Sequence, residues 1–135
     1  MQILKELRGC RAIGISGHEN PDGDCAGSCL GLALYLRKAM PEARVDVFLE
    51  PLPAELERNI PGTELLITDF QTPVDVYDAF VVLDSESTRI GPAQALFERA
   101  KMTVNIDHHI SNPGCGTVNY VDGEASSASE LVYDV

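Results

Sequence analysis

Short apolar runs, most of them ended by a glycine or an acidic residue, alternate along the chain with segments in which apolar residues recur every three or four positions. The short runs predict strands at residues 12–17, 45–49, 65–67, 79–83, 102–106 and 117–121. The helically spaced segments predict helices at residues 25–40, 52–58 and 92–100, and the end of an amphipathic helix at residues 1–7. Strands that alternate with helices in this way indicate an α/β fold, with a mostly parallel sheet flanked by helices.

The composition fits one globular domain without a membrane segment. A chain of 135 residues can bury a hydrophobic core, and 44% of its residues are hydrophobic, yet no apolar run approaches the length of a membrane span. The first seven residues include Lys5 and Glu6, so they do not resemble the apolar part of a secretion signal. We therefore expect a cytoplasmic protein with no membrane partner.

The net charge narrows the range of partners. Acidic residues outnumber basic residues by 21 to 10, which gives a net charge of −11. Non-specific binding to long duplex nucleic acid needs a basic face, so we do not expect this domain to bind it. A small anionic substrate remains compatible with an acidic chain if bound cations reverse the sign of the charge locally.

The four cysteines, Cys10, Cys25, Cys29 and Cys115, form no CxxC pair. Cys25 and Cys29 lie one helical turn apart, and Cys115 lies in a segment rich in proline and glycine. A chain of this size with its own core has little need of disulfides. We expect buried, reduced thiols rather than disulfides or zinc ligands.

Ligand-type side chains follow three of the predicted strands at the point where each strand ends. They are His18, Asp22 and Asp24 after the first strand, Asp84 after another, and Asp107, His108 and His109 after a third. In a parallel sheet the carboxyl ends of the strands share one edge, and ligands bind outside that edge. We expect these side chains to converge there, although Asp22 and Asp24 alone would also suit a turn and a helix cap.

Carboxylates gathered at one edge would repel each other, and some would have to take up protons. Two divalent cations would make the same arrangement favourable, and a carboxylate at a strand end, such as Asp84, can bridge ions about 3.5–4 Å apart. Such a pair lowers the pKa of a water molecule and clamps phosphoryl oxygens. The constellation therefore predicts metal-dependent hydrolysis of phosphoesters.

The spacing of these residues resembles the DHH phosphoesterase superfamily over nearly the whole chain. The residues that carry the resemblance are His18-x-x-Pro21-Asp22-x-Asp24-x-x-Gly27-Ser28, then Asp84, then Asp107-His108-His109. The sequence is most similar to the branch of nanoRNases and 3′,5′-bisphosphonucleotide (pAp) phosphatases. Arg89-Ile90-Gly91 and Ser111-Asn112 also fit that branch.

The resemblance implies a centre of two divalent metal ions, usually manganese. His18 and Asp22 would hold one ion, Asp24 and His108 the other, and Asp84 would bridge them. The partner implied is a short oligonucleotide or a nucleotide substrate, and a homodimer is compatible with the resemblance.

The resemblance also implies roles for two further residues of the Asp-His-His motif. His109 would face the substrate phosphate, where it would stabilise charge or protonate the leaving group. Asp107 would orient the histidines rather than bind metal directly. We expect Arg89 to be a surface salt-bridge partner and Asn112 to cap its loop, and we assign no role to Asp78.

Two other functions use similar residues. A cyclic dinucleotide phosphodiesterase would need the same metal ligands, and a catalytically silent regulatory domain could keep metal or nucleotide binding without turnover. A dinucleotide-binding Rossmann domain fits poorly, because the first turn offers Gly14-x-x-Gly17 and no GxGxxG, and places acids where pyrophosphate would lie.

The family pattern extends past the end of the chain. Family members carry a further aspartate ligand beyond the helix that a capping box at Ser127 and Glu130 opens here, and a second domain with a glycine-rich, basic motif. We therefore expect residues 1–135 to form a DHH catalytic domain that is incomplete at its C-terminal end. The second, substrate-binding domain would lie outside this chain, and the chain alone would have little or no activity.

Overall fold

A single sheet organises the chain in the computed structural model, which describes residues 3–109 and 111–122. Its strands are β1 (Ala12–Ser16), β2 (Arg44–Phe48), β3 (Leu66–Ile67), β4 (Ala79–Leu83), β5 (Met102–Asp107) and β6 (Val118–Val121). They lie in the order β3-β2-β1-β4-β5-β6, and every neighbouring pair is parallel. The predicted α/β fold is confirmed, and the sheet is parallel throughout the described residues.

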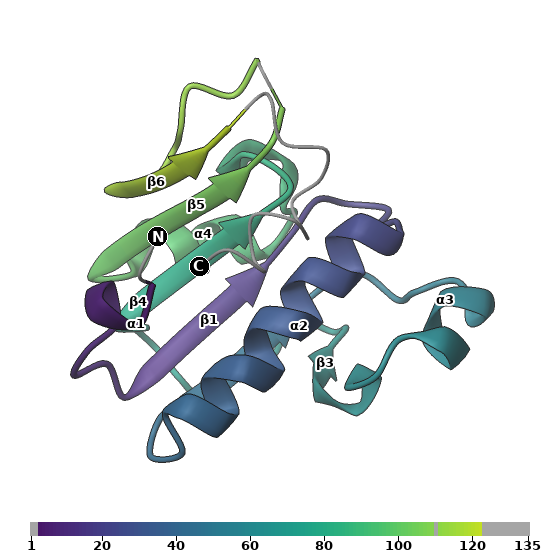
Figure 1. The fold of residues 1–135 in the computed structure, drawn as a ribbon, viewed down its shortest axis with the longest axis horizontal. Helices are drawn as coiled ribbons and strands as arrows, with labels where there is room; N and C mark the ends of the chain where they lie inside the picture. Colours follow the sequence, from purple (N-terminus) through teal and green to yellow (C-terminus); the bar gives the residue numbers. More distant parts are fainter. Residues whose placement is uncertain (1–2, 110, 123–135) are drawn as a thin grey trace.

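Helices cover the sheet on its two faces (Figure 1). The described helices are α1 (Ile3–Glu6), α2 (Gly23–Ala39), α3 (Ala54–Asn59) and α4 (Ala93–Arg99), with short 3-10 turns η1 (Thr63–Leu65) and η2 (Ser87–Arg89). The long helix α2 lies across the front of the sheet in this view, and α4 lies behind it. The two longer helices, α2 and α4, therefore bury apolar side chains against opposite faces of the strands.

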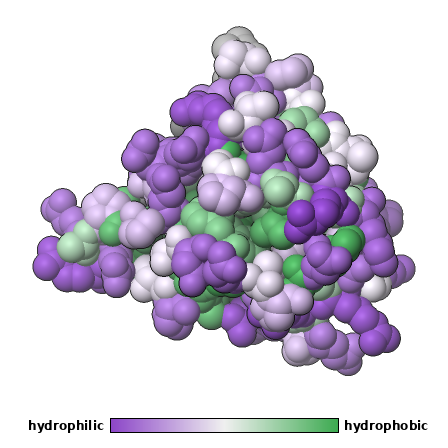
Figure 2. Space-filling model, turned by 180° about the vertical axis from the view of Figure 1, so that it is seen from behind, coloured by the Kyte–Doolittle hydropathy of each residue, from purple (hydrophilic) through white to green (hydrophobic). Residues whose placement is uncertain are grey.

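The two-residue period of the strands divides the core into two clusters. In β4, Val81 and Leu83 belong to the cluster beneath α2, whereas Phe80 and Val82 belong to the cluster beneath α4. Gly14 of β1 makes room for the second cluster, because a Cβ at that position would collide with the ring of Phe80. Seen from behind, this side of the molecule is mostly hydrophilic, with hydrophobic residues showing in its central area (Figure 2).

The start of α2 differs from the prediction by two residues. The helix begins at Gly23 rather than at Cys25, because the side chain of Asp22 accepts a hydrogen bond of 2.9 Å from the Cys25 backbone and caps the first turn. The helix ends at Ala39, in agreement with the break expected before Pro41.

Other boundaries shift in the shorter elements. The predicted helix at residues 52–58 is the short helix α3, which has no buried residue, and the predicted strand at residues 65–67 is divided between η1 and a two-residue β3. The helix predicted from Ser127 lies outside the described residues. None of the described helices is both long and apolar enough to cross a membrane.

The strand order places one crevice at the centre of the sheet. From β1 the chain moves outward through β2 and β3, and then returns to add β4, β5 and β6 on the other side of β1. The segments that follow β1 and β4 therefore lead into opposite halves of the sheet, and parallel α/β sheets bind ligands at such switch points.

Candidate metal centre

Asp84 lies at the middle of this crevice, one residue after β4. Its backbone adopts φ = 59°, in the left-handed region, and its N–H donates to the carbonyl of Ile106 at 2.9 Å. This conformation costs a non-glycine residue of order 1 kcal/mol, and such residues cluster at functional sites. The Asp84 side chain is only 3% exposed, so a carboxylate is held inside the rim of the sheet.

The two oxygens of Asp84 face two different imidazoles. Oδ2 lies 3.2 Å from Nε2 of His18, and Oδ1 lies 3.0 Å from Nε2 of His108. His18 follows β1 and His108 follows β5, and these strands flank β4 on either side. Asp84 thus stands between two histidines in the manner of a bridging carboxylate.

Asp22, just before α2, and Asp24, in the first turn of α2, are close to these histidines. Asp22 Oδ1 is 3.8 Å from His18 Nε2, and Asp24 Oδ2 is 3.5 Å from His108 Nε2. The structure therefore brings together all five side chains expected to bind metal. It divides them into two neighbouring groups that share Asp84, one with His18 and Asp22 and the other with His108 and Asp24.

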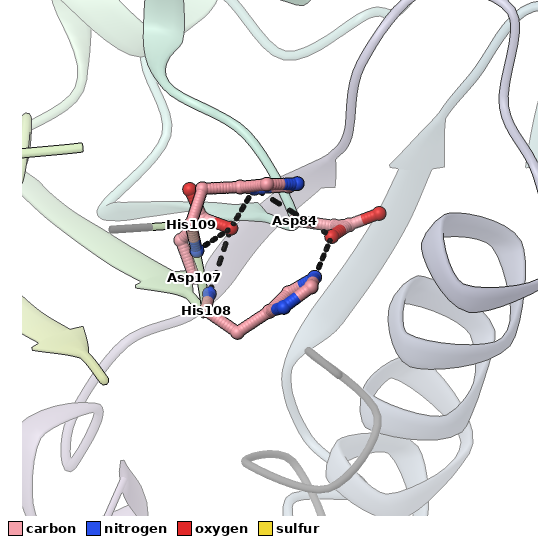
Figure 3. A group of neighbouring side chains, drawn as sticks. All are labelled: Asp84, Asp107, His108 and His109. Carbon is pink, nitrogen blue, oxygen red and sulfur yellow. Dashed lines mark hydrogen bonds and ion pairs between the residues drawn. The ribbon is translucent and has the colours of Figure 1, made fainter. Parts of the chain in front are cut away.

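Asp107 is fully buried at the end of β5 and holds the two histidines that follow it. Its Oδ1 accepts hydrogen bonds from the backbone N–H of His108 at 2.8 Å and of His109 at 3.3 Å. The same oxygen lies 2.6 Å from Nδ1 of His109 (Figure 3). The rings of His108 and His109 lie against each other, with centroids 4.3 Å apart. Because Nδ1 of His109 faces Asp107, Nε2 is the nitrogen that can face a substrate.

Two buried asparagines support Asp107, one from β5 and one from the loop that follows it. Asn112 Nδ2 donates to Asp107 Oδ2 at 2.8 Å and to Asn105 Oδ1 at 2.9 Å, and Asn105 Nδ2 donates to the carbonyls of Val82 and Ser85. Asn112 also accepts from a loop N–H, as the expected loop cap would. Sequence reasoning missed the role of Asn105, although a buried amide two residues before Asp107 in an apolar strand is a signal of such a network.

Ionising the carboxyl groups of this site together costs free energy. Burial raises the pKa of Asp84 to about 6, and the charges of Asp24 and Asp22 add to the shift. A hydrogen bond with Cys25 is the largest influence on His18, and it raises the pKa of that imidazole to about 10 against the opposing effect of burial. A cation among these groups would stabilise the carboxylates. Imidazole nitrogens and carboxylate oxygens are ligands that divalent transition metals accept, so the donor set fits such ions.

The site opens into a hollow of about 390 Å³. Its walls are His18, Asp22, Asp24, Asp84, Arg89, His108 and His109. Arg89 was expected to be a surface salt-bridge partner, yet it lies on the wall of this hollow. A larger hollow of about 690 Å³ lies at the amino ends of β1 and β2, lined by residues 9–11 and 39–43. We regard the smaller hollow as the functional one, because it gathers the histidines and acids.

Residues 12–135 match the model of the DHH family, N-terminal domain. The bifunctional oligoribonuclease and PAP phosphatase NrnA of Thermus thermophilus is 30% identical over 144 residues, which cover 99% of this chain and 38% of that protein. The protein of the same name from Bacillus subtilis is 28% identical over 136 residues, with 99% and 41% covered.

A solved structure is similar over the same part. The crystal structure of an exopolyphosphatase-related protein from Bacteroides fragilis matches with a TM-score of 0.83 and 27% identity, over 98% of this chain and 41% of that one. The chain therefore spans about two fifths of the length of the relatives it matches.

Proposed function

Because the chain belongs to the DHH family, we propose that it carries the metal centre of a phosphoesterase that hydrolyses short oligonucleotides, pAp-type nucleotides or both. The observation that supports this most strongly is the position of Asp84 between His18 and His108, with an acid beside each histidine. Two similar proteins named oligoribonuclease and PAP phosphatase support the choice of substrates.

The proposed centre holds two divalent cations, with manganese as the expected metal. His18 and Asp22 would hold one ion, Asp24 and His108 would hold the other, and Asp84, which lies between the two histidines, would bind both. Divalent cations at these positions would lower the pKa of a water molecule and neutralise charge on the phosphoryl oxygens.

His109 and Asp107 act on the substrate side of this centre. Asp107 receives the Nδ1–H of His109, and this fixes the direction of the ring. When both ring nitrogens carry a proton, Nε2–H donates to a phosphoryl oxygen or passes its proton to the leaving oxygen. His109 is 44% exposed and lies on the wall of the hollow, where a bound phosphate can reach it.

Arg89 supplies positive charge on the same wall. A guanidinium can form two parallel hydrogen bonds to a phosphate, and this holds the substrate in one orientation. In a chain with a net charge of −11, the arginine and the two cations provide the local attraction for an anionic substrate. We place the activity in the cytoplasm, since all four cysteines are unpaired and suit a reducing compartment.

The proposal is tested by replacing Asp84 with asparagine in the full-length protein. Wild-type protein should hydrolyse pAp or a short oligoribonucleotide with added Mn²⁺, and Asp84→Asn should lose at least about 100-fold in kcat/KM because the bridging charge is gone. The matched control is Asp69→Asn, an exposed acid away from the site. Full activity of Asp84→Asn would overturn the mechanism. If the wild-type protein hydrolyses only a cyclic dinucleotide, the proposed substrates are wrong and the protein is a cyclic dinucleotide phosphodiesterase.

A further inference from the structure

A cysteine thiol lies against one half of the metal centre. His18, Cys25 and Asp84 each offer a ligand atom, and these three atoms all lie within 4.8 Å of one another. Cys25 is fully buried and comes from the first turn of α2. An imidazole, a thiol and a carboxylate at such distances form a recognised type of site for a transition metal.

The turn between β1 and α2 is built around this thiol. The backbone N–H of Cys25 donates to Asp22 Oδ1 at 2.9 Å, and this bond fixes the residue in the first helical turn. A Cβ at Gly17 would collide with the sulfur of Cys25, so the glycine leaves the space that the thiol fills. Cys29, one turn further along, is equally buried but does not belong to the group of ligand atoms around Asp84.

The acid assigned to the same ion is far more exposed than the thiol. Asp22 approaches His18 no closer than 3.8 Å, its side chain is 64% exposed, and one of its oxygens already caps α2. The thiol of Cys25, by contrast, is held in the interior. Two ligand atoms with bonds of about 2.0–2.3 Å to one ion can be at most about 4.6 Å apart, so small side-chain movements would complete the site.

We propose that the sulfur of Cys25 binds the same cation as His18 and Asp84, as a thiolate ligand. The inference rests on the proposed metal centre. Binding releases the thiol proton to solvent as the sulfur–metal bond forms. The alternative interpretation is that Cys25 is a buried thiol that only hydrogen-bonds to His18.

A thiolate at one position would make the two ions unequal. Soft sulfur ligands favour Zn²⁺, Co²⁺ or Fe²⁺ over Mn²⁺, whereas Asp24 and His108 offer only oxygen and nitrogen to the second ion. The ion bound by His18, Cys25 and Asp84 would then be the tighter one, and Mn²⁺ would be the weaker competitor for it.

Cobalt is the probe for the experiment, because thiolate–Co²⁺ bonds give a charge-transfer band in the near ultraviolet that oxygen and nitrogen ligands do not give. Titration of the metal-free protein with Co²⁺ should produce this band together with the visible ligand-field bands. Cys25→Ser should lose the near-ultraviolet band and keep visible bands, whereas Cys29→Ser, the matched control, should keep both. Zn²⁺ affinity of Cys25→Ser should also fall about tenfold or more, with a much smaller change for Mn²⁺.

The outcomes separate this inference from the proposed function. Visible bands without a near-ultraviolet band in the wild-type protein, or a band that survives in Cys25→Ser, would overturn the role of Cys25 and leave the metal centre standing. Absence of any Co²⁺ binding would overturn both. If Cys25→Ser does not fold, zinc X-ray absorption on the wild-type protein decides. A sulfur shell at about 2.3 Å supports the inference, and nitrogen and oxygen shells alone at about 2.0–2.1 Å contradict it.

Discussion

The carboxylate of Asp107 lies 2.6 Å from Nδ1 of His109 and is itself completely buried. A buried acid against one ring nitrogen sets the direction of the other, as in catalytic sites where a carboxylate orients a histidine. The relationship separates the role of Asp107 from that of the proposed metal ligands, and it can be tested without disturbing them.

Asp107→Asn should reduce kcat by about 10–100-fold, because the amide can hold His109 in the wrong tautomer while it keeps the backbone contacts. Steady-state kinetics with Mn²⁺ and metal analysis on the same samples are the measurements. The number of bound ions should be unchanged. Loss of an ion in this variant would mean that Asp107 is a direct ligand.

The two histidines of the motif should respond differently to the same replacement. His108→Gln removes a nitrogen that faces both Asp24 and Asp84, so one of two ions should be lost from the protein. His109→Gln should keep both ions and lose at least about 100-fold in kcat, as expected when a proton donor is removed. Metal content by mass spectrometry, measured beside kcat, distinguishes them, and equal metal loss in the two variants would refute the division of roles.

Arg89→Ala should raise KM for a phosphorylated substrate by about tenfold and leave the metal content unchanged, since the guanidinium is proposed to hold the phosphate. Arg89→Lys should recover only part of the loss, because an ammonium cannot form two parallel hydrogen bonds. Arg37→Ala, an exposed arginine on α2, is the matched control. An unchanged KM in Arg89→Ala would return Arg89 to the surface role expected from the sequence.

Asp78 should stabilise the fold in a pH-dependent way. Hydrogen bonds from the backbone N–H groups of Arg11 and Ala12 hold its pKa below the ordinary value, and Lys101 adds to the shift. A lowered carboxyl pKa means that the contribution is present above the unfolded pKa of about 4 and is lost as the pH falls through the folded pKa.

Asp78→Asn should therefore lower the free energy of unfolding by about 1 kcal/mol at pH 7, and the difference should shrink towards pH 3. Urea unfolding at several pH values measures this, with the exposed Asp75→Asn as control. A difference that grows as the pH falls would contradict the assignment.

Sequence patterns predicted the parts of the site that depend on strand ends. Asp84, His18 and His108 each follow a central strand, and a parallel sheet must bring such ends together. The same reasoning could not reach Arg89, because its place on the wall depends on the short turn η2 after Asp84 rather than on a strand. The sequence pattern also did not single out Cys25 as a candidate ligand. Spacing along a helix does not reveal that its thiol fills the space left by Gly17.

The bounds of the elements were also predicted well where the hydrophobic pattern decides them, and less well where a single side chain does. β4 begins and ends at the same residues as the apolar run, because a strand buried on both faces is apolar at every position. The start of α2 moved to Gly23 because a hydrogen bond to one side chain, Asp22, decides where the first turn begins. Local capping of this kind shifts a boundary by two residues without altering the hydrophobic pattern.

The most direct test of the account is the position of bound metal in crystals grown with Mn²⁺ or Co²⁺ and measured at the absorption edge of the metal. The account predicts two anomalous peaks about 3.5–4 Å apart, one beside each oxygen of Asp84, with His18 next to one peak and His108 next to the other. A single peak, or peaks that do not contact Asp84, would contradict it.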